Sequence, residues 1–346
     1  MKSIFVLGCG FGTALSILWS KAGHSVTAYS KFPDEIEAIK RDRTTRLLPG
    51  ITIPTGIEFT CDITRAETAD IIVFAVPSKF VAEVAEQIAP YVTSKAVLVS
   101  ASKGFAKCTP CMKKHSGISA DIAYCRLSEI VSHHIPKNPV VALTGPCHAE
   151  EVAKDCPTTV VAATSGDMNY AEYVQGLLQT KTFRVYANDD ICGSELGGAL
   201  KNPIALCCGI AKGMGSGDNS AAALMTRGMA EIKRLGVELG ASWQTFTGLS
   251  GIGDLIVTCT SIHSRNYRAG LLIGKGVPAE EAIKQIGTVE GYECVKVAVE
   301  LAEKLGVDIP IFNELYKICY EGLSPAAALD SLMNRPLRNE REWYQR

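Results

Sequence analysis

Residues Ser3 to Tyr29, which read SIFVLGCGFGTALSILWSKAGHSVTAY, contain the pattern that decides the fold of this 346-residue chain. Ser3–Leu7 is a short apolar run, as expected of a strand buried on both faces, and His24–Tyr29 is a second strand candidate. Between them lies a glycine loop, Gly8-Cys-Gly-Phe-Gly12, followed by apolar residues at helical spacing as far as Gly23. Such glycines let a pyrophosphate approach the backbone, and the helix that follows offers it amides and a positive dipole. The stretch therefore predicts a dinucleotide-binding unit.

Outward from this unit the strand pattern continues and then stops. Further strand candidates are Asp70–Val76, Ala96–Ser102, Pro139–Leu143, Thr158–Ala163 and Thr182–Tyr186, and Ser78–Tyr91 has helical spacing. After Asn188 the strand pattern ends, and residues 191–332 are almost entirely of helical type. We predict an α/β protein with an N-terminal Rossmann-like dinucleotide-binding domain at residues 1–188. An all-helical C-terminal domain for substrate and catalysis follows at residues 189–346.

The composition excludes several partners. Hydrophobic residues make up 47% and charged residues 21%, as in ordinary globular proteins, and the net charge of −1 provides no basic surplus for nucleic acid or an anionic membrane. No apolar run approaches the ~20 residues of a membrane span. The thirteen cysteines are scattered through apolar segments, which favours reduced thiols and a cytoplasmic location.

One cluster resembles a metal site: Cys108-x-x-Cys111, with Cys125 and His133-His134 downstream. It lacks the second ligand pair of a zinc motif, so we expect no metal, and we predict helix and loop for residues 106–138.

The end of the second strand indicates the coenzyme. An acid about 20 residues past the glycines would accept a hydrogen bond from a free ribose 2′-hydroxyl. This chain instead has Ser30 and Lys31 there, and its first acid is Asp34. A hydroxyl and a cation suit a 2′-phosphate, so we expect NADP (NADPH) to be preferred over NAD. The alternative is that Lys31 is a solvated loop lysine.

A second notable stretch is Glu195–Pro203, ELGGALKNP. If it is helical, the residues three and four positions from Lys201 are glycine or apolar, and none is acidic. We therefore expect an ammonium without a local ion partner, whose pKa is lowered by desolvation toward that of a usable base. Pro203 should free the carbonyl of Ala199. The alternative is a lysine that reaches solvent at the helix rim.

Other polar residues follow strands or lie in glycine-rich loops. Lys103 follows a strand whose carboxyl end should face the ligand crevice. Asp254 would orient a lysine or a substrate hydroxyl, and Arg265 with the helix after it would bind a phosphate; a helix cap and a surface ion pair are the alternatives. Gly270-x-x-x-Gly274-Lys-Gly276 is one residue short of a nucleotide P-loop and lacks its Ser or Thr, so we do not assign it to phosphate.

Taken together, seven segments resemble the bacterial-type NAD(P)-dependent glycerol-3-phosphate dehydrogenase family over nearly the whole chain. They are Thr13-Ala-Leu, Ser102-Lys-Gly104, Thr144-Gly-Pro146, Gly197-Gly-Ala-Leu-Lys-Asn202, Gly253-Asp-Leu255, Ser264-Arg-Asn266 and Val289-Glu-Gly291. The family reaction is reversible hydride transfer between the nicotinamide and C2 of sn-glycerol 3-phosphate, giving dihydroxyacetone phosphate. Glycerol 3-phosphate for phospholipid synthesis would be the product in the cell.

The resemblance implies a role for each matched residue. Lys201 resembles the acid/base catalyst. The residues that resemble substrate contacts are Lys103, Gly145, Cys147, Lys201, Asp254, Ser264, Arg265 and Asn266. The residues on the coenzyme side are Gly8, Gly10, Phe11, Gly12, Lys31, Lys103, Ala149, Arg265 and Glu290.

The chain departs from the family pattern at three places. The glycine loop is one residue shorter than Gly-x-Gly-x-x-Gly, so either the first helix begins later or its amides no longer point at the pyrophosphate. Cys147-His148 stands where the family usually has Ser or Thr and then Phe. The Thr288–Glu290 segment is also one residue short.

Two rival functions are a non-catalytic NADP(H)-binding regulator on the same fold and a reductase of another small hydroxy compound. The sequence leaves open the oligomeric state, a homodimer included, together with the physiological direction and feedback control.

Overall fold

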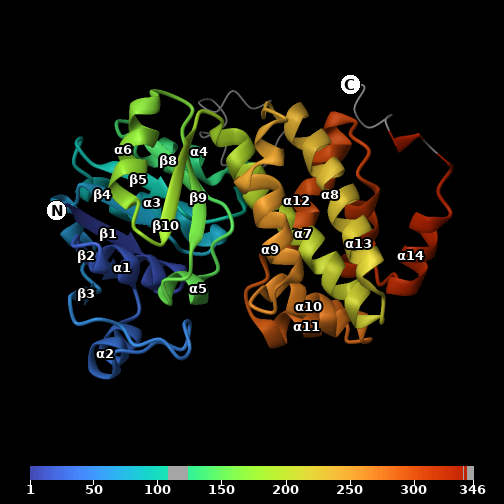
Figure 1. Ribbon diagram of the computed structural model, residues 1–346, viewed down its shortest axis with the longest axis horizontal. Helices are drawn as coiled ribbons and strands as arrows, with labels where there is room; N and C mark the ends of the chain where they lie inside the picture. The colour runs from blue at the N-terminus through green and yellow to red at the C-terminus, as the bar shows by residue number, and fades with distance from the viewer. Residues whose placement is uncertain (108–123, 338, 341–346) are drawn as a thin grey trace. The chain divides into compact units, whose positions relative to one another are not determined.

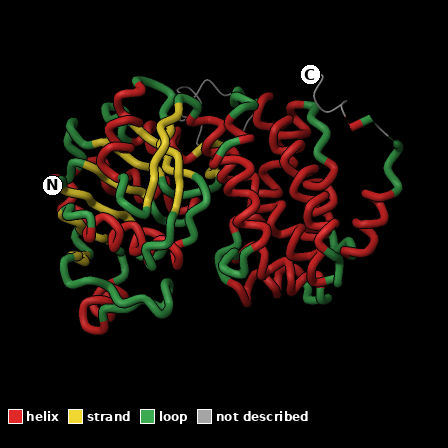
Figure 2. Tube along the Cα trace, viewed as in Figure 1, coloured by secondary structure: helices red, strands yellow, loops and turns green. Residues whose placement is uncertain are grey.

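The computed structural model describes residues 1–107, 124–337 and 339–340 (Figure 1). The chain divides into two compact units, Met1–Glu195 and Leu196–Arg346. All the strands described belong to the first unit, and the described part of the second is built from helices and turns (Figure 2). The predicted class is confirmed: an α/β unit is followed by a helical one.

The first unit is organised around an eight-stranded sheet. Its strands are β1 (Ser3–Leu7), β2 (Ser25–Tyr29), β3 (Ile57–Thr60), β4 (Ile71–Phe74), β5 (Val97–Ser100), β8 (Val140–Thr144), β9 (Thr158–Ala163) and β10 (Phe183–Asn188). The spatial order is β10-β9-β8-β5-β4-β1-β2-β3, and neighbouring strands are parallel except for the antiparallel pair β8 and β9. The carboxyl ends of β1, β2, β4, β5 and β8 therefore lie along one edge, where the predicted coenzyme residues follow them.

Alternate side chains of the strands enter two separate cores. In β1, Ile4 and Val6 belong to one core, whereas Phe5 and Leu7 belong to the other, and all four are at most 1% exposed. This is the strand buried on both faces that the apolar run predicts.

Helices cover both faces of the sheet. They are α1 (Phe11–Lys21), α2 (Pro33–Asp42), α3 (Val81–Ile88), α4 (Leu127–His134), α5 (Ala149–Ala153) and α6 (Met168–Leu178). The apolar side chains of α1, α2, α5 and α6 pack in the core that contains Ile4, and those of α3 and α4 pack in the core that contains Phe5.

The segment after β5 differs from the prediction of helix and loop. Here β6 (Phe105–Lys107) and β7 (Tyr124–Arg126) form a small antiparallel sheet ahead of α4. Cys108, Cys111 and the rest of residues 108–123 lie outside the described residues. The described cysteines other than Cys125 are free thiols, as expected, whereas Cys125 is disulfide-bonded. Among the described residues, no group of three or more His, Cys, Asp or Glu side chains is placed to hold a metal ion.

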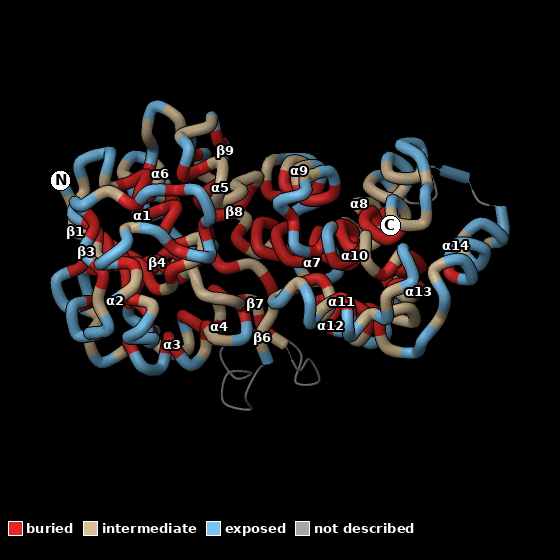
Figure 3. The backbone as a smooth tube through the Cα atoms, turned by 90° about the horizontal axis from the view of Figure 1, so that it is seen from below, coloured by how far each residue is buried: buried red, intermediate tan, exposed pale blue. Residues whose placement is uncertain are grey.

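The second unit packs its helices around α7. The helices are α7 (Ile191–Gly213), α8 (Asp218–Glu238), α9 (Asp254–Thr260), α10 (Arg265–Gly274), α11 (Ala279–Ile286), α12 (Glu290–Leu305), α13 (Pro310–Tyr320) and α14 (Pro325–Met333). The first five residues of α7 belong to the first unit. Most of α7 is buried, as its red trace in Figure 3 shows. No helix in the described parts of the chain is long and apolar enough to cross a membrane.

Glycines bring α7 and α10 into close contact. A Cβ atom placed on Gly270 would lie 2.2 Å from the carbonyl oxygen of Leu206, and one on Gly274 would lie 2.1 Å from that of Ile210. From the α7 side, a Cβ on Gly209 would lie 2.2 Å from the carbonyl oxygen of Tyr267. We call this α7–α10 contact the glycine seam. It gives the Gly270-x-x-x-Gly274 segment a structural reason, because only glycine lets two helix backbones approach so closely.

Candidate active site

The glycine loop of the first unit is packed closely against the strands beside it. Gly8 has φ +110° and donates its N–H to the carbonyl of Tyr29 at 2.9 Å, which ties the loop to the end of β2. A Cβ atom on Gly8 would lie 2.8 Å from the Ala75 carbonyl oxygen, and one on Gly12 would lie 2.9 Å from Val6 Cγ1. Gly12 therefore allows the close helix–strand packing of dinucleotide-binding loops.

The short loop does not delay the first helix. α1 begins at Phe11, directly after Gly10, so the helix has not started later to absorb the missing residue. Leu15, Leu18 and Trp19 are at most 3% exposed, and the apolar face of α1 is therefore packed despite the deletion.

Lys103 and Gly145 meet at the carboxyl edge of the sheet. Lys103 follows β5 and Gly145 follows β8, its neighbour, and Lys103 Nζ donates a hydrogen bond to the Gly145 carbonyl oxygen at 2.9 Å. Cys147 Sγ lies 3.5 Å from Lys103 Nζ and donates to the same carbonyl at 3.1 Å. Ala149, the last coenzyme-side residue of this unit, is the first residue of α5.

At the end of β2, Ser30 and Lys31 both contact carboxylates. Ser30 Oγ donates to Glu35 Oε2 at 2.6 Å, and Lys31 Nζ pairs with Glu83 Oε1 at 2.9 Å. The side chains of Lys31 and Glu83 are 42% and 45% exposed, so this pair is accessible to solvent and weak.

In the second unit, Lys201 is buried between two side chains of α9. It is 5% exposed, and its Nζ contacts Asp254 Oδ1 and lies 2.7 Å from Thr258 Oγ1. Asp254 is the first residue of α9 and is 1% exposed. The expectation of a lysine without a local ion partner holds only within its own helix, because the ion partner comes from 53 residues further along the chain. The hypothesis that Asp254 orients a lysine agrees with this contact.

The effect of Pro203 on α7 is visible one turn away. Pro203 has no N–H to donate to the carbonyl of Ala199. That carbonyl accepts a hydrogen bond from Cys294 Sγ of α12 at 3.4 Å. The part of α7 next to Lys201 is thus hydrogen-bonded to α12.

Two buried asparagines connect α7, α10 and α12. Asn266 Nδ2 donates to Asn202 Oδ1 at 2.9 Å, and Asn266 Oδ1 accepts from the backbone N–H of Gly291 at 2.8 Å. Ser264 caps α10 by accepting the N–H of Tyr267 at 3.2 Å. Arg265 is the exposed first residue of α10, and Glu290 is the first residue of α12. Apart from Lys201, which lies inside α7, the substrate and coenzyme residues predicted in this unit lie at or next to the first residues of α9, α10 and α12.

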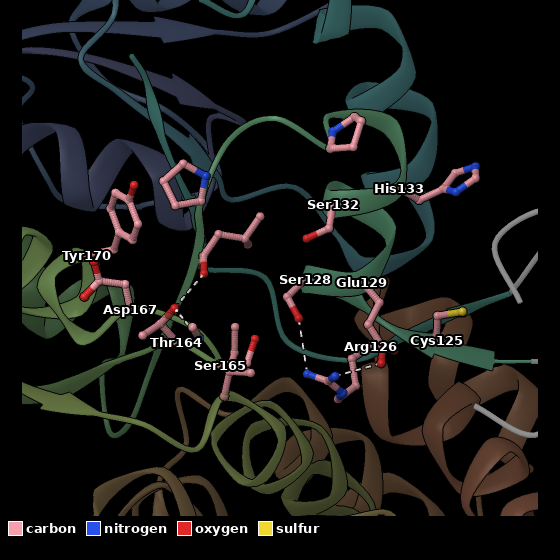
Figure 4. Close-up of a pocket in the computed structure, with 15 residues that line it drawn as sticks. Cys125, Arg126, Ser128, Glu129, Ser132, His133, Thr164, Ser165, Asp167 and Tyr170 are labelled. Atoms are coloured by element: carbon pink, nitrogen blue, oxygen red, sulfur yellow. Dashed lines mark hydrogen bonds and ion pairs between the residues drawn. The ribbon is translucent and has the colours of Figure 1, made fainter. Parts of the chain in front are cut away.

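A separate pocket of about 670 Å³ in the first unit is lined by none of the predicted site residues (Figure 4). Arg126 at its base donates to Glu195 Oε2 at 2.9 Å and to Glu129 Oε1 at 2.7 Å. Glu195 also accepts the N–H of Ser128 at 2.8 Å, so its carboxylate fastens the first turns of α7 to α4. We call this arrangement the Glu195 clamp. Its charges are paired with one another, and we assign it to structure rather than catalysis.

Comparison with known proteins identifies the family. Residues 3–170 match the family described as NAD-dependent glycerol-3-phosphate dehydrogenase N-terminus, and residues 190–330 match its C-terminus. The chain belongs to this family. The resemblance predicted from the sequence motifs is thereby confirmed.

Similar glycerol-3-phosphate dehydrogenases span nearly the whole chain. The glycerol-3-phosphate dehydrogenase (NAD(P)+) of Clostridium acetobutylicum is 48% identical over 97% of this chain and 98% of its own length. The enzyme of that name from Lysinibacillus sphaericus is 45% identical over 98% of both chains. The crystal structure of glycerol-3-phosphate dehydrogenase from Coxiella burnetii has a TM-score of 0.88 and 33% identity, covering 96% of this chain and 99% of that chain.

Within the glycerol-3-phosphate dehydrogenase fold, the sequence motifs missed two contacts. Thr258 was not predicted, although it lies four residues after Asp254 on the same helix and so on the same face. Glu35 was not predicted either, because it lies beyond Asp34 in the chain and comes back to the end of β2 only through the fold of α2. Its side chain returns to Ser30 from the first turn of α2.

Proposed function

We propose that this chain is an NAD(P)-dependent sn-glycerol-3-phosphate dehydrogenase, which transfers hydride reversibly between NAD(P)H and dihydroxyacetone phosphate. The observation that carries the proposal is the buried Lys201, in contact with Asp254 and 2.7 Å from Thr258. A protein that only senses a coenzyme needs no buried acid/base group, so this arrangement favours an enzyme over a regulator.

Lys201 would handle the proton of the reaction. When bound, the nicotinamide ring supplies or accepts the hydride. In the reductive direction the Lys201 ammonium donates a proton to the carbonyl oxygen at C2, and in the oxidative direction the neutral amine takes the proton from the hydroxyl. Asp254 and Thr258 each contact Nζ, so they hold the amino group of Lys201 in place. A positioned proton donor of this kind is typically worth ~10²–10⁴ in rate.

The substrate phosphate would bind at the start of α10. Arg265 provides a charge there, and a helix N-terminus attracts anions. The buried Asn266 is fixed by its two hydrogen bonds. We assign Lys103, Gly145, Cys147, Lys201, Asp254, Ser264, Arg265 and Asn266 to substrate binding.

The coenzyme would bind on the glycine loop, whose close contacts exclude side chains at Gly8 and Gly12. We assign Gly8, Gly10, Phe11, Gly12, Lys31, Lys103, Ala149, Arg265 and Glu290 to coenzyme binding. The preference for NADPH remains a prediction that rests on Ser30 and Lys31.

The same proposal covers the cellular setting. Residues 1–188 would be the dinucleotide-binding domain and residues 189–346 the substrate and catalytic domain. The enzyme would work in the cytoplasm, supplying glycerol 3-phosphate for phospholipid synthesis. A homodimer is the assembly we would test first, by sedimentation.

The decisive experiment is a spectrophotometric assay of dihydroxyacetone phosphate with NADPH and with NADH. We expect loss of the absorbance of the reduced nicotinamide and formation of glycerol 3-phosphate. Coenzyme binding without turnover would favour the regulator. Turnover with another phosphorylated ketone but not with dihydroxyacetone phosphate would favour the rival reductase.

A further inference from the structure

A carboxylate lies at the end of β2, where the sequence has no acid. Ser30 directly follows β2, is 6% exposed, and donates its hydroxyl hydrogen to Glu35 Oε2 at 2.6 Å. Glu35 belongs to the first turn of α2, which begins at Pro33. The helix therefore returns an acid to the strand end that it follows.

The same carboxylate lies close to the glycine loop. Burial is the main cause that raises the pKa of the Cys9 thiol, and the charge of Glu35 raises it further. Cys9 lies between Gly8 and Gly10, and its Sγ is 3.9 Å from the carbonyl oxygen of Tyr29, the last residue of β2. Glu35 thus contacts the residue after β2 by a hydrogen bond and acts on the glycine loop through its charge. These two features bracket the adenosine ribose in a dinucleotide-binding fold.

The two coenzymes present different chemistry to such an acid. The ribose of NADH has a 2′-hydroxyl, which donates a hydrogen bond, whereas NADPH carries an anionic 2′-phosphate that a nearby carboxylate repels. A carboxylate has about four acceptor sites, so Glu35 could accept from Ser30 and from a ribose hydroxyl together. Lys31 would act in the opposite sense and attract the 2′-phosphate.

We propose that Glu35 is a specificity-determining residue that accepts the ribose 2′-hydroxyl of NADH and disfavours the 2′-phosphate of NADPH. The proposal rests on the proposed function for its reaction, and it deepens that function by explaining how one site would accept both coenzymes. Lys31 would favour NADPH and Glu35 would favour NADH, so the two side chains together set the relative affinity for the two coenzymes.

The test compares Glu35→Gln with Glu37→Gln, a control that removes an exposed carboxylate from the same helix. Like charges in contact cost several kcal/mol, so we expect Glu35→Gln to raise the NADPH-to-NADH ratio of kcat/KM at least about tenfold. The change should appear mainly in the KM for each coenzyme, because the ribose 2′-position takes no part in hydride transfer. Lys31→Ala should move the ratio the other way. A ratio within twofold of the Glu37→Gln value would overturn the proposal.

Binding measurements keep this test separate from the proposed reaction. Adenosine 2′,5′-bisphosphate and AMP carry only the adenosine half, and Glu35→Gln should improve binding of the first relative to the second. This holds even if wild-type protein does not reduce dihydroxyacetone phosphate, a result that would sink the proposed function alone. If Glu35→Gln does not fold, Glu35→Asp serves instead: its shorter reach should weaken NADH binding without weakening NADPH binding. Equal loss for both coenzymes would also overturn the proposal.

Discussion

Lys201 and Asp254 are a buried pair, and a variant at either position has consequences beyond catalysis. Replacing one member of such a pair leaves the other charge without a partner, which typically costs about 3–5 kcal/mol. The neutral pair Lys201→Met with Asp254→Asn removes both charges while keeping similar volumes. The pair therefore allows catalysis and stability to be measured separately.

We predict that Lys201→Met lowers kcat by ~10²-fold or more, because the proton donor is lost. It should also lower the free energy of unfolding, and the double variant should recover part of that loss while staying inactive. Steady-state assays and urea unfolding of the three proteins check this. Near-normal turnover of Lys201→Met would refute the assigned role.

Glu231 of α8 gives the stability of the second unit a pH dependence. It accepts the backbone N–H groups of Ile311 and Phe312 at the start of α13, but it is 1% exposed. Burial raises the pKa of its carboxyl to about 8, although the two N–H groups and Arg234 act in the opposite direction. The folded protein therefore binds a proton that the unfolded chain, with an ordinary carboxyl pKa near ~4.3, has already released.

It follows that this group stabilises the fold fully below about pH 4, and that its contribution is lost as pH rises toward 8. We expect the free energy of unfolding to fall with pH in that window, by at most ~1.4 kcal/mol per unit from this group. Glu231→Gln should flatten the profile, whereas Glu238→Gln, an exposed change on the same helix, should not. Identical profiles for the two variants would count against this assignment.

At the scale of elements, the glycine seam requires α7 and α10 to keep glycine where their backbones approach closely. A methyl group on Gly270 would overlap the Leu206 carbonyl oxygen, 2.2 Å from the new Cβ. Gly176 of α6 provides the matched control, because a Cβ there meets nothing within 4 Å.

Gly270→Ala should lower the free energy of unfolding by roughly 1–3 kcal/mol or more, the usual cost of overpacking. Gly176→Ala should leave stability unchanged or raise it by up to about 1 kcal/mol, since alanine favours a helix over glycine. Thermal and urea unfolding would decide, and equal effects of the two variants would contradict a seam that requires glycine.

The glycine loop is the other element whose detail has consequences. One residue fewer ahead of a helix turns its register by ~100°, and α1 has not started later in compensation. We expect weakened coenzyme binding in the natural chain. Inserting one Ser between Gly10 and Phe11 should then lower the Kd for NADPH in a fluorescence titration. A Kd that is unchanged or higher would show that the short loop is already a competent cradle.

At the scale of the whole molecule, α7 is shared by the two units, and the Glu195 clamp fastens its first turns. Burial alone would lower the pKa of the Arg126 guanidinium, but the charges of Glu195 and Glu129 outweigh it and the pKa is raised. Arg126 is thus stabilised by its two carboxylates.

Removing one carboxylate from this buried group should be costly. Glu195→Ala is expected to lower the free energy of unfolding by about 3–5 kcal/mol. Glu300→Ala breaks a pair with Lys304 whose side chains are 34–35% exposed, and it should cost about 0–1 kcal/mol. Urea unfolding compares the two. Similar losses would mean that the clamp is no stronger than a surface pair.

Periodicity was sufficient to predict the architecture, because buried strands and amphipathic helices leave local patterns. It missed β3 and the β6–β7 sheet, which are short and have exposed residues. The sequence motifs predicted that Lys201 and Asp254 belong to the site. They could not show that the two side chains are in contact, because the residues are 53 positions apart and local patterns do not fix such pairings. Glu35 was missed for a related reason, since its position depends on how α2 returns to the strand that precedes it.

The continuity of α7 also determines how this enzyme can be recombined with its relatives. A chimera joined between Glu195 and Leu196, where the two units meet, would place its junction inside a helix. The graft would then have to reproduce the hydrogen bonds of that helix across two parental sequences. A short connection joins β10, which ends at Asn188, to α7, which begins at Ile191. If the junction is placed there, the whole of α7 comes from one parental sequence. Exchanging coenzyme modules between members of the family would therefore succeed at that connection, provided that the donor of α4 also supplies a partner for Glu195.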